Sequence, residues 1–150
     1  MATHEELEVY RQLRAAQEKY IYFLLAAVGA CLAFSLSQTN QAPLSMGQIP
    51  LAIAVSMWGI SFFCGCKYLH ATESITYANS QFLKAENGTH PISGQNPAYI
   101  QATLLAINSS INSSGVWAAR YKSGQFYFFI GAVIFYIIWH ALEMWARTNA

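Results

Sequence analysis

The chain has 150 residues, of which 55% are hydrophobic and 10% are charged, and its formal net charge is +1. Soluble globular proteins carry about a quarter charged residues, so this composition excludes an ordinary water-soluble surface. The eight Lys and Arg residues are scattered singly or in pairs, which excludes the basic stripe of a nucleic-acid-binding protein. A lipid bilayer is therefore the expected partner, and nucleic acid is not.

The first segment, residues 1–19, has the pattern of an amphipathic helix with mixed charges. Thr3 and Glu6 are spaced as in a capping box, which marks a helix start. The residues that recur along one side are Leu7, Tyr10, Leu13 or Arg14, and Gln17. Such a helix either docks at a membrane surface or extends the next segment into solvent, and the second interpretation is favoured.

Residues 20–69 predict a transmembrane hairpin with one span over 20–37 and another over 50–69. Each span is long enough to cross about 30 Å of hydrocarbon at 1.5 Å per residue. The linker between them carries no charge, whereas four basic residues flank the opposite ends of the spans: Arg11, Arg14, Lys19 and Lys67. The positive-inside rule then places the N-terminus in the cytoplasm, and we expect a multi-pass protein of a bacterial inner membrane.

Small residues recur at three- and four-residue intervals in both spans, a pattern that lets helix backbones approach closely in lipid. They are Ala26, Gly29, Ala30 and Ala33 in the first span, and Ala52, Ser56 and Gly59 in the second. These faces either pack the two spans together or join copies of the chain. We expect a closed homo-oligomer, because three spans bury little surface on their own.

Residues 70–121 predict a cytoplasmic helical hairpin. Apolar residues recur at helical spacing up to the breaker Asn87-Gly88, and a second helix is expected to start at Asn96-Pro97. The polar side of that second helix is expected to line a pore or to face the axis of an assembly. Its members are Asn108, Ser109, Asn112 and Ser113.

The uncharged segment 97–119 has an alternative interpretation as a polar fourth span. Its five Leu and Ile residues favour insertion by only about 0.3–0.6 kcal/mol each, whereas its Asn and Ser side chains oppose insertion. Three spans place seven of the eight basic residues in the cytoplasm, and four spans place six there. Three spans are therefore preferred, and four remain open.

Residues 125–146 predict a C-terminal transmembrane helix, with Trp139 and Trp145 at the level of an interfacial aromatic belt. Glu143 and Arg147 have the spacing of an ion pair on one helix face. The two tryptophans and the ion pair together indicate that this segment is the end of a span at the membrane surface.

His140 and Glu143 repeat the spacing of His70 and Glu73. His and Glu side chains one turn apart on two helices can together hold a metal ion. Three spans place the two pairs on opposite sides of the membrane, whereas four spans bring them to the same side. A metal site is therefore an alternative that depends on the number of spans.

No nucleophile elbow, glycine-rich phosphate loop or zincin helix occurs in the sequence, and no aspartate. We therefore expect a non-enzymatic protein without a cofactor. The expected fold is an all-α integral membrane protein with three, or alternatively four, transmembrane helices and a cytoplasmic hairpin. The expected function is a homo-oligomeric channel or membrane-perturbing effector controlled through its cytoplasmic helices. The alternatives are a membrane anchor that recruits a soluble cytoplasmic partner, and a metalloprotein that uses both His-x-x-Glu pairs.

Overall fold

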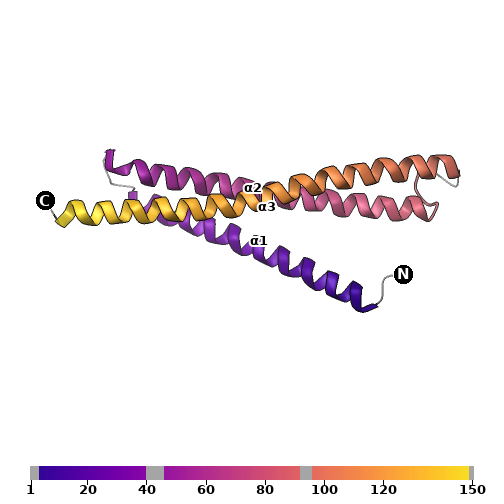
Figure 1. Ribbon diagram of the computed structural model, residues 1–150, viewed down its shortest axis with the longest axis horizontal. Helices are drawn as coiled ribbons and strands as arrows, with labels where there is room; N and C mark the ends of the chain where they lie inside the picture. The colour runs from indigo at the N-terminus through magenta and orange to yellow at the C-terminus, as the bar shows by residue number, and fades with distance from the viewer. Residues whose placement is uncertain (1–3, 40–45, 92–95, 149–150) are drawn as a thin grey trace. The chain divides into compact units, whose positions relative to one another are not determined.

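The computed structural model describes residues 4–39, 46–91 and 96–148, and the described residues contain helices and no strand (Figure 1). The elements are α1 (His4–Thr39), the 3-10 helix η1 (Met46–Gln48), α2 (Ile49–Glu86) and α3 (Pro97–Thr148). The prediction of an all-α chain is confirmed. Each α-helix contains a segment long and apolar enough to cross a membrane.

The third helix runs without interruption for 52 residues. The sequence predicted two separate segments here, a hairpin helix that ends near residue 121 and a span over 125–146. A fourth span requires the chain to reverse between 119 and 126, and α3 continues through these residues instead. A single Gly124 does not stop it, because a glycine inside a helix costs only about 1 kcal/mol relative to alanine.

The chain divides into two compact units, and α2 and α3 each contribute to both. Unit 1 comprises residues 1–65 and 125–150, and unit 2 comprises residues 66–124. Unit 1 therefore holds α1, the first part of α2 and the last part of α3. Unit 2 holds the remaining parts of α2 and α3.

The core of unit 1 forms where side chains of its three helices meet. Its buried centre consists of Val28, Ala54, Trp58 and Ala132. Further side chains packed against it are Cys31, Leu32, Met57, Phe129, Phe135 and Tyr136. The rings of Trp58 and Tyr136 lie 5.6 Å apart between centroids. Helix α1 presents Ile21, Leu24 and Val28 as buried residues at three- and four-residue spacing, whereas none of its described side chains before Ile21 is buried.

The small residues of the first two spans lie outside this core. Ala26, Ala30, Ala33, Ala52, Ser56 and Gly59 are exposed, and Gly29 is half-buried. A Cβ atom added at Gly29 or Gly59 would meet no atom of the described residues within 4 Å. Within one protomer, α1 and α2 therefore pack through other residues, among them Val28 and Trp58, and packing of the small faces between copies stays a prediction.

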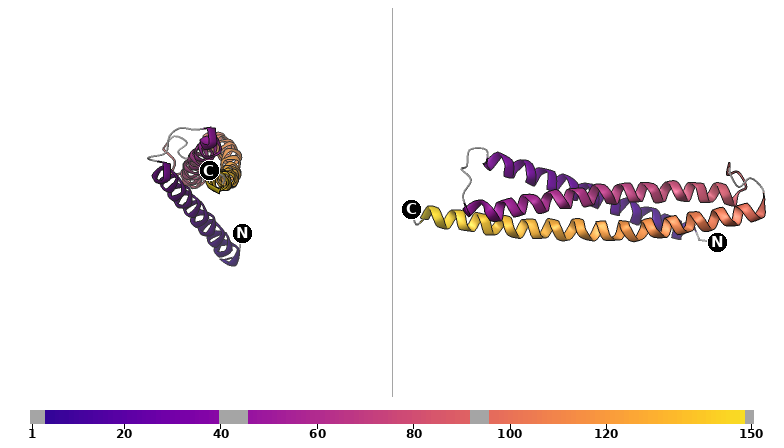
Figure 2. Two further views of the ribbon diagram at one scale, coloured as in Figure 1. Left: turned by 90° about the vertical axis from the view of Figure 1, so that its left-hand side faces the viewer. Right: turned by 90° about the horizontal axis from the view of Figure 1, so that it is seen from above.

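Unit 2 is a helical hairpin in which the ends of α2 and α3 lie side by side (Figures 1 and 2). The predicted apolar stripes face inward: Ile75, Ala78, Phe82 and Ala85 of α2, and Ile100, Leu104, Ile107 and Ile111 of α3, are half-buried or buried. The turn begins as predicted at Asn87-Gly88. Gly88 adopts a φ of 67°, and the amides of Gly88 and Thr89 donate to Ala85 O and Lys84 O at 3.1 and 2.9 Å. These bonds form a Schellman motif, which ends α2.

The predicted start of α3 is also confirmed. The amide of Ala98 donates to Asn96 Oδ1 at 3.1 Å, and Pro97 occupies the first helical position. The predicted capping residue of α1, Thr3, lies outside the described residues, as do the side chains of Glu6, Leu7 and Tyr10.

Candidate functional site

Polar side chains are buried along the core of unit 1. Ser35, Ser61 and Gln125 are at most 1% exposed. Ser61 Oγ donates a hydrogen bond to the backbone oxygen of Gln125 at 2.7 Å, which links α2 to α3. Within the described part of the chain, neither Nε2 nor Oε1 of Gln125 has a partner. An apolar core disfavours an unpaired amide, so Gln125 is an unusual residue at this position.

Gln125 packs against a glycine of α2. A Cβ atom at Gly65 would lie 2.7 Å from Gln125 Nε2 and 2.7 Å from Leu25 Cδ2. Gly65 therefore makes the room in which the amide lies, where all three helices of unit 1 approach one another. The sequence placed Gln125 only at the edge of a span, and no local pattern identified it as a buried residue.

A pocket of about 190 Å³ opens in unit 1 at the C-terminal ends of α1 and α3. Its apolar and aromatic lining consists of Phe34, Tyr136, Trp139 and Met144. Its polar lining consists of Gln38, His140, Glu143 and Arg147. This pocket is the candidate functional site of unit 1, because it gathers both charges and aromatic rings in one small space.

The charged wall of the pocket is an ion pair on α3. Arg147 Nη2 and Nε reach the same oxygen, Glu143 Oε1, at 3.1 and 3.2 Å. The predicted pairing of Glu143 with Arg147 is confirmed. His140 lies one turn before Glu143 and lines the same pocket.

The aromatic wall continues the core of unit 1 outward. The rings of Tyr136 and Trp139 lie 5.6 Å apart between centroids at 43°, and Tyr136 in turn approaches Trp58. Trp139 is 9% exposed, and its Nε1 has no hydrogen-bond acceptor among the described residues. The predicted interfacial Trp139 is therefore a mostly buried wall of the pocket.

The second His/Glu pair belongs to unit 2. His70 Nδ1 and Glu73 Oε2 lie 4.0 Å apart, and both side chains are more than 70% exposed. They line an open groove of about 520 Å³ together with Ser74, Tyr77, Ala78, Gln81, Ile107 and Ser110. The groove belongs to the hairpin alone.

The two His/Glu pairs belong to different units, His70 and Glu73 to unit 2 and His140 and Glu143 to unit 1. Over residues 4–39, 46–91 and 96–148, no three His, Cys or Glu side chains gather where they could hold a metal ion. Each pair therefore supplies two donors, fewer than the three or four protein ligands of a typical zinc site.

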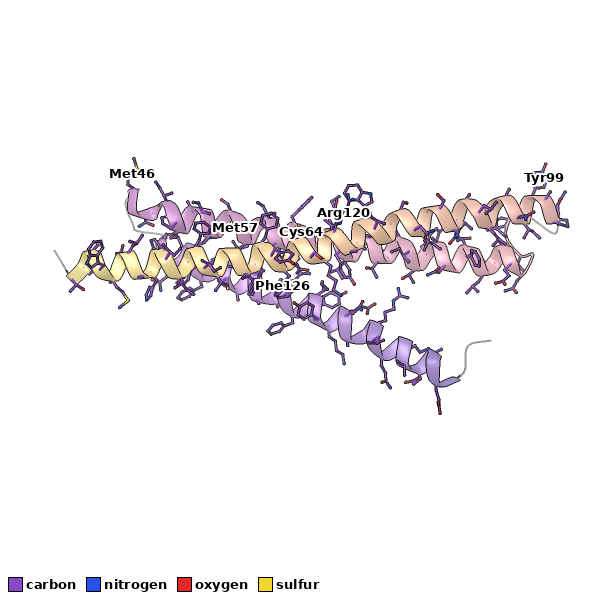
Figure 3. All side chains as sticks on the ribbon, viewed as in Figure 1. Met46, Met57, Cys64, Tyr99, Arg120 and Phe126 are labelled. Carbon is purple, nitrogen blue, oxygen red and sulfur yellow. The ribbon has the colours of Figure 1, made fainter. Side chains whose placement is uncertain are left out.

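The predicted axis residues lie in unit 2. Asn108, Ser109, Asn112 and Ser113 are all exposed, and Ser113 Oγ donates to the backbone oxygen of Ser110 at 3.0 Å. Near them the guanidinium of Arg120 lies 5.2 Å from the ring centroid of the exposed Trp117, and Figure 3 shows Arg120 and Tyr99 projecting outward from α3. This part of the α3 surface is exposed.

Neither a protein-family model nor a curated protein nor a solved structure matches this chain.

Proposed function

We propose that the chain is a homo-oligomeric integral membrane protein that forms a channel or perturbs the bilayer under the control of a cytoplasmic arm. Unit 1 supplies three spans, and unit 2 is the arm. The N-terminus and the arm lie in the cytoplasm, because Lys67, Lys84, Arg120 and Lys122 then obey the positive-inside rule. A bacterial inner membrane is the membrane we expect.

The observation that carries this proposal is the continuity of α2 and α3 between the units. Both helices pass from unit 1 into unit 2 without a break. Neither contains a proline beyond its first turn, and proline is the commonest cause of a kink. A ligand or protein that moves the arm therefore acts directly on two of the three spans.

A conduction path has to form between copies under this proposal. Trp58 and its neighbours fill the centre of one protomer, whereas the small faces of α1 and α2 are exposed. Small residues are favoured where transmembrane helices of different chains meet, because they permit close van der Waals packing. Under this proposal the exposed Asn and Ser side chains of the arm lie toward the axis of the oligomer.

A second function is supported by the surface of unit 2. Large apolar side chains are exposed there, namely Tyr77, Leu83, Tyr99, Leu105, Val116 and Trp117. Aromatic residues are enriched at protein interfaces, so the arm has the surface of a docking module. In this alternative the protein anchors a soluble cytoplasmic partner and conducts nothing.

Conductance in planar bilayers separates the two functions. We expect purified wild-type protein to give unitary currents, and Gly59→Leu to abolish them together with the oligomer, because a large side chain prevents close approach. Ile60→Leu is the matched control, since this neighbouring exposed residue keeps its size. Absence of current from assembled wild-type protein, with and without cell lysate as a source of activator, contradicts the channel and favours the anchor.

The membrane placement has its own test. Cysteines introduced singly at Lys122 and Asn149, on a background without Cys31, Cys64 and Cys66, report which side each position faces. We expect an impermeant thiol reagent applied to intact cells to label the cysteine at 149 and not that at 122. The reverse labelling overturns the proposed topology.

A further inference from the structure

The pocket at the C-terminal ends of α1 and α3 contains one charge of each sign. Glu143 and Arg147 contact each other through Oε1, and their side chains are 37% and 78% exposed. An exposed ion pair of this kind contributes little to stability, because water screens it. Breaking this ion pair to bind a ligand therefore costs little free energy.

The charge composition selects the class of ligand. An anion that approaches Arg147 also meets the negative Glu143, and a cation that approaches Glu143 also meets Arg147. A ligand with one positive and one negative group matches both residues at once. His140 and Glu143 are two metal donors, which is too few for a typical protein-held metal ion, so a zwitterion is the better match.

The aromatic wall identifies the positive group. Tyr136 and Trp139 present neighbouring rings with centroids 5.6 Å apart, and Phe34 lines the same pocket from α1. Aromatic faces attract ammonium groups, and tryptophan does so most strongly. The combination of aromatic rings with a carboxylate suits an ammonium, whereas Arg147 and the amide of Gln38 are donors that suit a phosphate.

The size and place of the pocket identify the source of the zwitterion. Its volume of about 190 Å³ is below the range of about 300–1,000 Å³ typical of sites for drug-sized ligands, so it accepts a headgroup and not a large molecule. It opens where α1 and α3 end, and the exposed Trp145 follows Met144 of its lining on the same helix. Tryptophan is enriched at membrane interfaces. Phospholipid headgroups occupy this level of a bilayer.

We infer that the pocket formed by Phe34, Gln38, Tyr136, Trp139, Glu143 and Arg147 binds the zwitterionic headgroup of a phospholipid. The ammonium lies against Glu143 and the aromatic rings, and the phosphate lies against Arg147 and Gln38. The inference rests on the membrane placement of unit 1 in the proposed function. It does not depend on whether the assembly conducts ions.

Native mass spectrometry of the full chain in detergent tests this inference by titration with three lipids. Phosphatidylethanolamine and phosphatidylcholine are zwitterionic, and phosphatidylglycerol carries a phosphate without an ammonium. We expect both zwitterionic lipids to bind about tenfold more tightly than phosphatidylglycerol, the effect of about one charge-assisted contact. Equal binding of the three lipids overturns the inference.

Two substitutions in the pocket should have different effects on lipid binding. Glu143→Gln leaves a net positive pocket, so we expect phosphatidylglycerol to bind as well as or better than the zwitterionic lipids. Arg147→Gln removes the phosphate partner and should weaken all three lipids. General damage to the fold does not produce a reversal confined to one variant, and retained secondary structure by circular dichroism confirms folding.

A second ion pair provides matched controls. Arg14 Nε and Glu18 Oε1 lie 3.8 Å apart on α1, also four residues apart. Arg14→Gln and Glu18→Gln change the net charge equally and should leave the lipid preference unchanged. If Glu18→Gln alters the preference as Glu143→Gln does, net charge is the cause and the pocket is not the site.

A competition experiment distinguishes a soluble zwitterionic ligand from a lipid. We expect free phosphoethanolamine to displace bound phosphatidylethanolamine only at concentrations at least about a hundredfold higher, because the acyl chains add buried apolar surface. If phosphoethanolamine binds as tightly as the lipid, the ligand is a soluble compound and the lipid assignment is overturned. Currents are measured independently, so equal binding of the three lipids to wild-type protein that still conducts refutes this inference alone.

Discussion

The buried amide of Gln125 gives the most direct test of the packing in unit 1. Neither amide atom has a hydrogen-bond partner in the described ranges, and the side chain is fully buried. An unpaired buried polar group costs about 1–3 kcal/mol. Gln125→Met keeps an unbranched side chain of similar length and removes both polar atoms, so we expect it to raise the free energy of unfolding by about 2 kcal/mol.

The measurement is unfolding of the purified protein in mixed micelles by increasing SDS, followed by circular dichroism. Gln101→Met is the matched control, because Gln101 is an exposed residue of the same helix; its effect should stay within about 0.5 kcal/mol. Destabilisation of the Gln125→Met variant by about 1 kcal/mol or more, the contribution of roughly one hydrogen bond, refutes the reasoning. It would mean that the amide is satisfied in solution, for example by a buried water.

The remaining predictions concern the same assay. Gly65→Ala should destabilise by about 1–3 kcal/mol through overpacking, since its Cβ meets Gln125 Nε2 at 2.7 Å. Gly59→Ala, whose Cβ meets no atom of the described part of the chain within 4 Å, should instead stabilise by up to about 1 kcal/mol through helix propensity; equal effects would contradict the geometry. Ser61→Ala should cost about 0.6 kcal/mol, the average for hydrogen bonds between membrane helices, and no loss would show that the 2.7 Å contact adds no stability. Asn96→Ala should cost about 1 kcal/mol by loss of the N-cap and speed hydrogen exchange in the first turn of α3; unchanged exchange there would refute the cap.

The sequence predicted the helices and the turn of unit 2 because these depend on local chemistry. Asn87-Gly88 stops α2, since glycine adopts a positive φ without steric cost, and Asn96-Pro97 starts α3 by capping the first turn. The apolar stripes of the hairpin also alternate with polar residues, so the buried face of each helix could be predicted from the sequence. Both signals act within a few residues.

The packing of unit 1 was not predictable in the same way. The spans predicted for unit 1 are apolar on most faces, so hydropathy does not distinguish the face that meets another helix from the face that stays exposed. The small faces around Ala30 and Gly59 therefore suggested contacts that the protomer makes through Trp58 and Val28 instead. The burial of Gln125 depends on Gly65, 60 residues earlier in the numbering, and on α1.

The pocket was predictable in part. The spacing of Glu143 and Arg147 on one helix face indicated their ion pair, because residues four apart lie one above the other. Phe34 and Gln38 come from α1, and no local pattern connects them with α3. The tertiary contact between the C-terminal ends of two helices, α1 and α3, was needed to form the pocket.

The continuity of α3 also bears on how the protein is made. A helix of 52 residues is about 78 Å long at 1.5 Å per residue, more than twice the thickness of the hydrocarbon layer. The translocon therefore finds no structural stop along it, and residues 97–119 offer it no charge. Under the proposed topology, Arg120 and Lys122, together with the Asn and Ser side chains of residues 97–119, determine during biosynthesis which part of α3 enters the lipid.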